Sequence, residues 1–536
     1  MKHNKSSAHI LVRNTSWIYA AKIVTQVLGV VALVLVIRKI DVEIFGRFNL
    51  FLSLFMLFGI FAVSPSIGVF RRYIPQLREQ HDAAEMVHTV IKWGAIACGL
   101  SLLIGGGLLG LHGQLGRLLK IGNMAEILPL FLAYVVCHGI HQLLTSLLTS
   151  LLLHKISAIL QIAGSLCRTV LYFILFNHLT VQALLLVEAV VAIVYMVPGS
   201  IAFLLWFKSF KVENASGAQS AAVPPDRQRV ARYGLFSFFN EIGAGIVGRA
   251  SDYYIVAALG TPLAVGLYAF AGRMFKLFSQ FLPVQDFLSV LRPVFITRFT
   301  RAHTQEDFLQ VYNFIVKVML PVYTFPGLFF LAVGRPVIAY VFDPKYLGAY
   351  WTSVIVLFMT LPMAFGLPLG LTVELKEQMQ VKVYSKSVAV LSIIGGILGM
   401  KFFGIIGVAA VTLLCDWTKN LIMQILLRRE IRIRHDIKSL RGYIGAWLTL
   451  SLGFYFLQPY ITSLILTVLV AGVFCALFGL TLVVFHPFSA QDLVMLDKLG
   501  TTSKRFTPVR RVVLRLFSGK QYFVQFLSGK GGENVR

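Results

Sequence analysis

Charged side chains inside long apolar segments are the residues of this sequence most able to do chemistry. The segment 233–259 carries Glu241, Arg249 and Asp252, which fall on one face of a helix at 100° per residue. A charge at the centre of a membrane costs about 2.5–3.5 kcal/mol, so each group must face protein or water. Two interpretations stay open. The three groups either form an internal ion pair that fixes packing, or make a gated site whose carboxylate exchanges with a substrate or with protons.

The next apolar segment, 263–288, carries two cations on one face with no acid beside them. Arg273, Lys276 and Gln280 follow the spacing i, i+3 and i+7, and Asp286 comes several turns later. Two neighbouring cations without a local counter-ion repel each other, and an anionic ligand relieves that repulsion. This face is therefore predicted to bind an anion.

The remaining intramembrane charges extend this cationic character. Lys22 and Arg168 are the other mid-segment bases in the first half of the chain, and Glu188 is placed to pair with either one. Asp416 and Lys419 are spaced i, i+3, which fits a structural ion pair or a coupling site. Because bases outnumber acids in these segments, the interior suits phosphate, and above all a diphosphate that arginine grips with two hydrogen bonds. The predicted substrate-binding residues are Arg249, Arg273, Lys276, Lys22, Arg168 and Gln280.

Histidines and cysteines offer no metal or redox chemistry. His138 and His141 are spaced i, i+3, but no third ligand stands near them in sequence. They are expected either to line a polar wall that hydrogen-bonds sugar hydroxyls or to form ordinary hydrogen bonds between helices. The five cysteines lie in apolar segments without a CxxC spacing. No catalytic residue, metal site or cofactor is predicted.

Membrane-spanning helices must position these residues. Each of fourteen apolar segments is near the ~20 residues that cross a bilayer, and 57% of the chain is hydrophobic. The predicted spans are 15–37, 45–69, 87–110, 127–149, 156–176, 180–206, 233–259, 263–288, 311–333, 350–372, 384–402, 404–427, 442–459 and 461–485.

The basic residues between the spans orient the chain. Lys and Arg number 49 against 23 Asp and Glu, and they concentrate at both ends of the chain and in every second connection. Cytoplasmic connections retain Lys and Arg, so both termini are predicted to be cytoplasmic. The excess positive charge lies beside spans, where it attracts anionic membrane lipids rather than nucleic acid.

The chain reads as two halves and a basic tail. The connection rich in Ala, Ser, Gly and Pro after the sixth span is a flexible linker. Glu43-Ile-Phe-Gly-Arg-Phe-Asn49 and Ala264-Val-Gly-Leu-Tyr-Ala-Phe270 open the second helix of each half, so the halves are read as a parallel repeat. Residues 504–530 alternate basic and bulky apolar groups, as in an amphipathic helix on the membrane surface. The predicted parts are an N-lobe (1–207), a linker (208–232), a C-lobe (233–430), two added helices (431–487) and a basic cytoplasmic tail (488–536).

Motif absences narrow the function. GxxxxGK[ST] and HExxH are missing, the cytoplasmic connections are too short for a nucleotide-binding domain, and the outer ones lack the large loop of a membrane glycosyltransferase. The sequence therefore predicts a transporter and not an enzyme.

The two repeat elements and Gly404-Ile-Ile-Gly-Val-Ala-Ala-Val411 resemble the polysaccharide transport (Wzx-type) branch of the multidrug/oligosaccharidyl-lipid/polysaccharide exporter superfamily. Ser251-Asp-Tyr-Tyr-Ile255 is also similar to the seventh helix of that family. The resemblance implies an all-α membrane protein of 14 transmembrane helices, with two parallel six-helix lobes around a central cavity and two C-terminal helices.

The resemblance also implies a function. Such a protein sits in a bacterial or archaeal cytoplasmic membrane and flips polyprenyl-diphosphate-linked oligosaccharide to the outer leaflet by alternating access. A polysaccharide polymerase and chain-length proteins are its expected partners, and H⁺ or Na⁺ is the expected coupling ion. The residues expected to couple that ion are Asp252, Glu241, Glu188 and Asp416.

Three alternative functions predict other sequence features. A multidrug or cation antiporter of the same superfamily would favour acidic lobes. A major-facilitator exporter would carry an acid in Gly68-Val-Phe-Arg-Arg-Tyr-Ile-Pro75, which has none. A non-transporting scaffold of an envelope-assembly complex would gain little from charges in the membrane.

Overall fold

The computed structural model describes most of the chain but not the middle of the predicted seventh span. The described residues are 2–79, 83–121, 124–215, 250–282, 305–376, 378–428 and 431–485, with Gln228, Phe488 and Asp492. Several predicted features lie outside them: Glu241, Arg249, Asp286 and the amphipathic segment 504–530.

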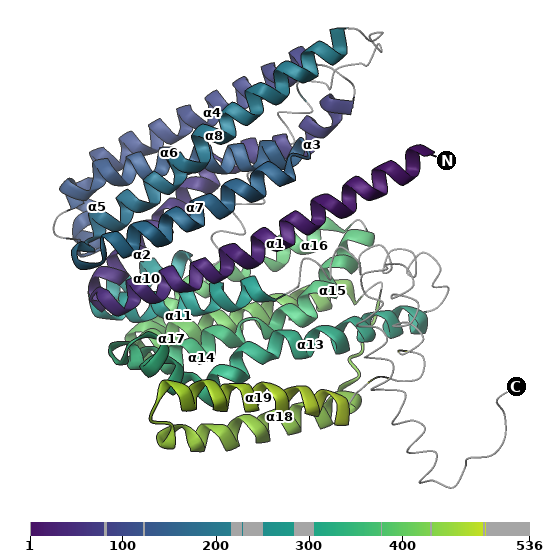
Figure 1. Cartoon of the computed structure of the whole chain (residues 1–536). Helices are drawn as coiled ribbons and strands as arrows, with labels where there is room; N and C mark the ends of the chain where they lie inside the picture. The colour runs from purple at the N-terminus through teal and green to yellow at the C-terminus, as the bar shows by residue number, and fades with distance from the viewer. Residues whose placement is uncertain are drawn as a thin grey trace, which may run out of the picture. The chain divides into compact units, whose positions relative to one another are not determined.

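The described residues form helices and no strand, which confirms the all-α membrane class (Figure 1). The α-helices are α1 (Lys2–Lys39), α2 (Val42–Ala62), α3 (Ser64–Glu79), α4 (Ala83–Gly110), α5 (His112–Leu118), α6 (Met124–Ser150), α7 (His154–Ile174), α8 (Val181–Ala215), α10 (Ala250–Leu259), α11 (Pro262–Phe281), α13 (Gln305–Pro336), α14 (Tyr350–Phe358), α15 (Leu361–Leu375), α16 (Met379–Ser385), α17 (Val388–Leu427), α18 (Ile437–Leu457) and α19 (Leu464–Val484). Short helical turns follow several of them: η1 (Phe176–His178), η2 (Val337–Phe342), η3 (Pro344–Ala349) and η4 (Gln458–Tyr460).

The described part of the structure differs from the sequence prediction in the number of membrane-spanning helices. Within the described ranges, ten helices are long and apolar enough to cross a membrane, so the predicted fourteen is not confirmed. Two predicted spans are counted there as the single helix α17. The predicted spans at α10, α11 and α18 are not among these ten helices. Helix α10 is only the described end of a longer predicted span, and α11 carries the charged residues Arg273 and Lys276.

Helix α17 is a hairpin, as the two predicted spans require. Gly404 has φ +61°, a left-handed conformation that glycine adopts without strain. A Cβ on Gly399 would lie 2.8 Å from the Gly407 carbonyl carbon, and one on Gly395 would lie 2.8 Å from Val411 Cγ1. Those pairs are far apart along a straight helix, so the chain must turn back at Gly404.

The second predicted span, 45–69, is divided in the structure. Helix α2 ends at Ala62 and α3 begins at Ser64. Pro65 has no backbone N–H and so cannot donate the next helical hydrogen bond, which accounts for the break. The continuation, α3, buries Val69, Phe70 and Ile74 and exposes Arg71 and Arg72.

The chain forms two compact units. Unit 1 comprises 1–273 and 389–411, and unit 2 comprises 274–388 and 412–536. The predicted division into lobes and linker stays a prediction, although α8 extends to Ala215, inside the predicted linker. In unit 1, α6 packs on α8, and α7 packs on α1 and α8. The core of this unit gathers Phe70, Trp93, Leu147 and Tyr195 from α3, α4, α6 and α8.

Helix α13 is the centre of unit 2. It contacts α14, α15, α18 and α19 (Figure 1). Trp447 of α18 stacks between Tyr443 and Phe478, at centroid distances of 4.6 and 5.1 Å, and donates a 2.9 Å hydrogen bond to Thr481 Oγ1. Phe325 of α13 packs against Phe478 with ring centroids 5.1 Å apart, so this aromatic core joins the final helix pair to α13.

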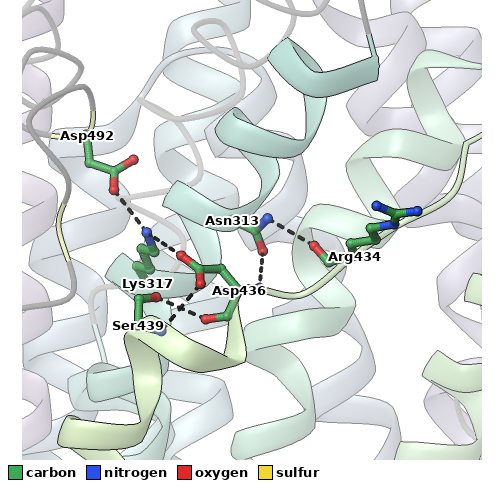
Figure 2. A network of polar contacts seen from close by, with 6 residues as sticks. All are labelled: Asn313, Lys317, Arg434, Asp436, Ser439 and Asp492. Carbon is green, nitrogen blue, oxygen red and sulfur yellow. Dashed lines mark hydrogen bonds and ion pairs between the residues drawn. The ribbon is translucent and has the colours of Figure 1, made fainter.

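Polar contacts fasten this helix pair to α13 at two places, in its first half and near its end. Figure 2 shows Lys317 Nζ within 3.0 Å of carboxylate oxygens of both Asp436 and Asp492. Near the other end, Gln458 Nε2 donates to the Leu331 carbonyl at 2.6 Å, and its Oε1 accepts from the Arg335 N–H at 3.3 Å. Lys317 is therefore buried and paired with two carboxylates.

Candidate substrate site

Arg273 is held by a neutral partner. It lies on α11, and its Nε donates a 2.7 Å hydrogen bond to Oδ1 of Asn49 on α2. Asn49 is buried and anchored in turn, since its Nδ2 donates to the Phe45 carbonyl at 2.8 Å. An amide orients a guanidinium without cancelling its charge. No described carboxylate forms an ion pair with Arg273, so the positive charge stays available to a ligand.

The two repeat elements bring their glycines together. A Cβ on Gly46 would lie 2.6 Å from the Gly266 backbone nitrogen, and one on Gly266 would collide with the Val42 carbonyl. Absence of side chains lets α2 and α11 approach at backbone contact. We call this contact, between Gly46 and Gly266, the glycine crossing. Nearby, the Ser53 and Tyr254 hydroxyls lie 3.4 Å apart.

Asp252 is the described acid of the predicted seventh span. It is fully buried in α10, and the Tyr268 hydroxyl of α11 donates a 2.6 Å hydrogen bond to its Oδ2. Asp252 also has contacts beyond this bond. A buried carboxylate oriented by a phenol is suited to exchange a proton or a small cation.

Arg168 and Glu188 form an ion pair. Arg168 Nη2 lies 2.8 Å from Glu188 Oε2, and the Tyr172 hydroxyl donates to Glu188 Oε1 at 3.0 Å. Of the two bases proposed as partners for Glu188, the structure thus joins it to Arg168. Because this cation already has a carboxylate, a phosphate would have to compete for it, which makes Arg168 a weaker anion ligand than Arg273.

His138 and His141 lie in an aromatic row. The His138 ring packs edge-on against Phe55 at 4.7 Å, and the His141 ring lies 4.2 Å from Tyr195. Nδ1 of His141 is buried without a hydrogen-bond partner in the described part of the chain. Contact with sugar hydroxyls stays a prediction. Three or more metal-ligating side chains do not gather anywhere among the described residues.

The other predicted residues are more dispersed. Lys22 is half-buried on α1, and Lys276 and Gln280 are exposed on α11. Asp416 and Lys419 form a 2.8 Å pair on α17, one of the two arrangements the spacing allowed. Asn49 and Tyr268, the partners of Arg273 and Asp252, were not predicted. Both lie inside the repeat elements, so a polar residue in each apolar motif was the available signal.

Comparison with known proteins identifies a family and a fold. The family model for polysaccharide biosynthesis protein matches residues 11–299. The structure is similar to that of the lipid II flippase MurJ in an inward closed conformation, with TM-score 0.60 and 13% identity over 86% of this chain and 98% of that one. It is also similar to an inward-facing multidrug resistance MATE family transporter of the MOP superfamily, with TM-score 0.59 and 15% identity over 75% of this chain and 94% of that one. No curated protein matches by sequence.

Proposed function

Since this chain belongs to the polysaccharide biosynthesis family of Wzx-like membrane flippases, we propose that it flips polyprenyl-diphosphate-linked oligosaccharide units from the cytoplasmic to the outer leaflet. The protein is a multi-pass membrane protein of a transporter family and not an enzyme. The substrate, its direction and its coupling ion are the proposed part.

Arg273 carries the proposal. Its charge is oriented by a buried neutral amide and has no described carboxylate partner. A diphosphate brings about two negative charges, and the hydroxyls of a glycan each cost several kcal/mol to expose to hydrocarbon. A guanidinium that is fixed but not neutralised supplies the interaction that such a headgroup loses on leaving water. An organic cation would be repelled by the same group, which argues against the antiporter.

Coupling to H⁺ or Na⁺ is proposed through Asp252. Asp252 is fully buried and accepts a hydrogen bond from Tyr268, and the charge of a carboxylate at such a position must be balanced within the protein. Exchange of a cation at this position is a means of tying transport to an ion gradient.

The experiment is complementation of cells depleted of the protein. Lipid-linked oligosaccharide is quantified in each leaflet by access of a membrane-impermeant glycan-cleaving enzyme. Arg273→Gln is expected to lower outer-leaflet oligosaccharide about tenfold or more, because a charge-assisted hydrogen bond contributes about 1.5–3 kcal/mol. Arg273→Lys should retain part of the activity, since it keeps the charge but not the two-pronged geometry.

The matched control is Arg117→Gln, the same change at an exposed residue of α5. Equal outer-leaflet oligosaccharide in Arg273→Gln and Arg117→Gln cells, at equal protein levels, would contradict the proposal. Loss of oligosaccharide from both leaflets would place the defect in its synthesis and would also contradict it.

A further inference from the structure

A small basic pocket lies beside the glycine crossing in unit 1. Arg47 of α2 and Lys120, which follows α5, line it together with apolar residues from α2, α10 and α11. The pocket has room for about one water molecule, and no acidic residue lines it. Two positive charges therefore line this pocket, while the nearby Glu43 is not part of its lining.

Arg47 is incompletely satisfied. Its Nε is buried without a hydrogen-bond partner among the described residues. The nearest carboxylate oxygen, from Glu43, is 4.0 Å from Nη2, and both side chains of this i, i+4 pair are over a third exposed. Exposed pairs of that kind contribute at most about 0.5 kcal/mol. Most of the capacity of the guanidinium to bind an anion is thus unused.

Lys120 occupies a backbone position that favours glycine. The Ile121 N–H bonds to the Gly116 carbonyl at 2.8 Å and the Lys120 N–H to the Arg117 carbonyl at 3.4 Å, which is the Schellman ending of a helix. Lys120 itself has φ 56°, in the left-handed region that costs a non-glycine residue about 1 kcal/mol or more. Leu152 takes the same conformation after α6, so the backbone alone does not call for a lysine.

The ammonium of Lys120 is held by a replaceable bond. Nζ donates at 2.5 Å to the carbonyl of Gly260, in the turn between α10 and α11. A phosphate oxygen is a stronger acceptor for an ammonium than a neutral carbonyl. An anion at the mouth of the pocket therefore competes with Gly260 for Lys120 and would release the turn after α5 from the turn before α11.

We propose that Arg47 and Lys120 form a phosphate-binding site at the mouth of this pocket, which itself admits only about one water molecule, and that this site receives the diphosphate of the flipped lipid. The proposal rests on the proposed function and on the predicted orientation, which puts the start of α2 on the outer side of the membrane. Diphosphate bound here favours separation of the two turns beside the glycine crossing. Binding of the substrate headgroup on the outer side thereby favours opening of the protein on that side.

The test measures binding of radiolabelled inorganic diphosphate to the full-length protein in lipid nanodiscs. All variants carry Arg273→Gln, so that the site around Arg273 does not contribute. Lys120→Gly removes the ammonium while relieving the backbone, so loss of binding cannot be attributed to misfolding if the melting temperature is kept. Lys120→Gly and Arg47→Gln are each expected to weaken diphosphate binding about tenfold. Arg117→Gln, three residues from Lys120 and outside the pocket, should change it less than twofold.

Two results would overturn the site: no diphosphate binding in the Arg273→Gln background, or equal weakening by Arg117→Gln, which would mean general attraction to a basic surface. Competition identifies the source of the phosphate. Farnesyl diphosphate displaces the label at lower concentration than inorganic phosphate if a lipid diphosphate is the ligand, and the reverse order contradicts the proposal. The leaflet assay on Arg273→Gln alone tests the proposed function, and its failure is read separately from this titration.

Discussion

Replacement of Lys317 by methionine tests whether one buried ammonium fastens the last two helices to α13. Lys317 is shared by two carboxylates in different surroundings, because the side chain of Asp492 is 3% exposed and that of Asp436 is 41% exposed (Figure 2). Without the ammonium, the Asp492 carboxylate stays buried and loses its 3.0 Å ion pair with Lys317; removing one partner of a buried pair costs about 3–5 kcal/mol. Asp436→Asn should cost no more than about 1 kcal/mol, because that pair is open to solvent and the amide still accepts from the Ser439 N–H.

The measurement is unfolding in a denaturing detergent, followed by tryptophan fluorescence. Trp447 lies in the α18–α19 core, and with the other five tryptophans replaced by phenylalanine its fluorescence reports on the helix pair. The decisive variant is the double change Lys317→Met with Asp492→Asn, which removes the buried charge together with its partner. It should be more stable than Lys317→Met alone. A double variant that is less stable than that single variant would refute the reasoning from a broken buried ion pair.

Two further predictions concern the glycine crossing and the loop before α18. Gly266→Ala should destabilise the protein by about 1–3 kcal/mol, because the new Cβ meets the Val42 backbone. In the same melting assay the control Gly94→Ala, whose Cβ has nothing within 4 Å, should be neutral or stabilising. Equal melting temperatures of the two variants would contradict the glycine crossing. Burial lowers the pKa of His435 below its ordinary 6.5, so the unfolded chain binds the proton more readily and stability falls as pH drops below 6.5. His435→Gln should flatten stability between pH 6.5 and 5, and an unchanged slope would exclude His435 as its source.

The pKa of Asp436 is lowered like that of His435, but by hydrogen bonds and not by burial. Burial raises the pKa of its carboxyl, yet hydrogen bonds from Lys317 and Ser439 outweigh that effect and leave it below 3.8. The stability it provides is complete at neutral pH and is lost only as the pH falls below about 3.8. The two groups therefore act in separate pH ranges, which lets one titration distinguish them.

The sequence predicted the helices better than it predicted the contacts between them. Runs of apolar residues predict each helix because backbone hydrogen bonding and burial in lipid are local requirements. Glycine repeats likewise pointed to Gly46 and Gly266 as equivalent positions. That the two touch each other depends on how α2 and α11 cross, and no spacing along the chain encodes such a distance.

Charge pairing shows the same limit. Arg168 and Glu188 lie on successive α-helices, α7 and α8, so their pairing was among the arrangements that the sequence allowed. The partners of Lys317 follow it by more than a hundred residues, and hydropathy near Lys317 gives no sign of them. The amide that orients Arg273 was missed for a related reason, since a buried asparagine in an apolar motif resembles any other polar interruption until its neighbour is known.

The double attachment of α18 and α19 has a mechanical consequence. Lys317 secures them in the first half of α13 and Gln458 near its end, so the pair cannot slide along that helix or swing away from it without breaking both attachments. When α13 moves during a transport cycle, α18 and α19 must therefore move with it. A probe on the lipid-exposed surface of α19 would therefore follow α13 itself, with no need to alter residues in the interior.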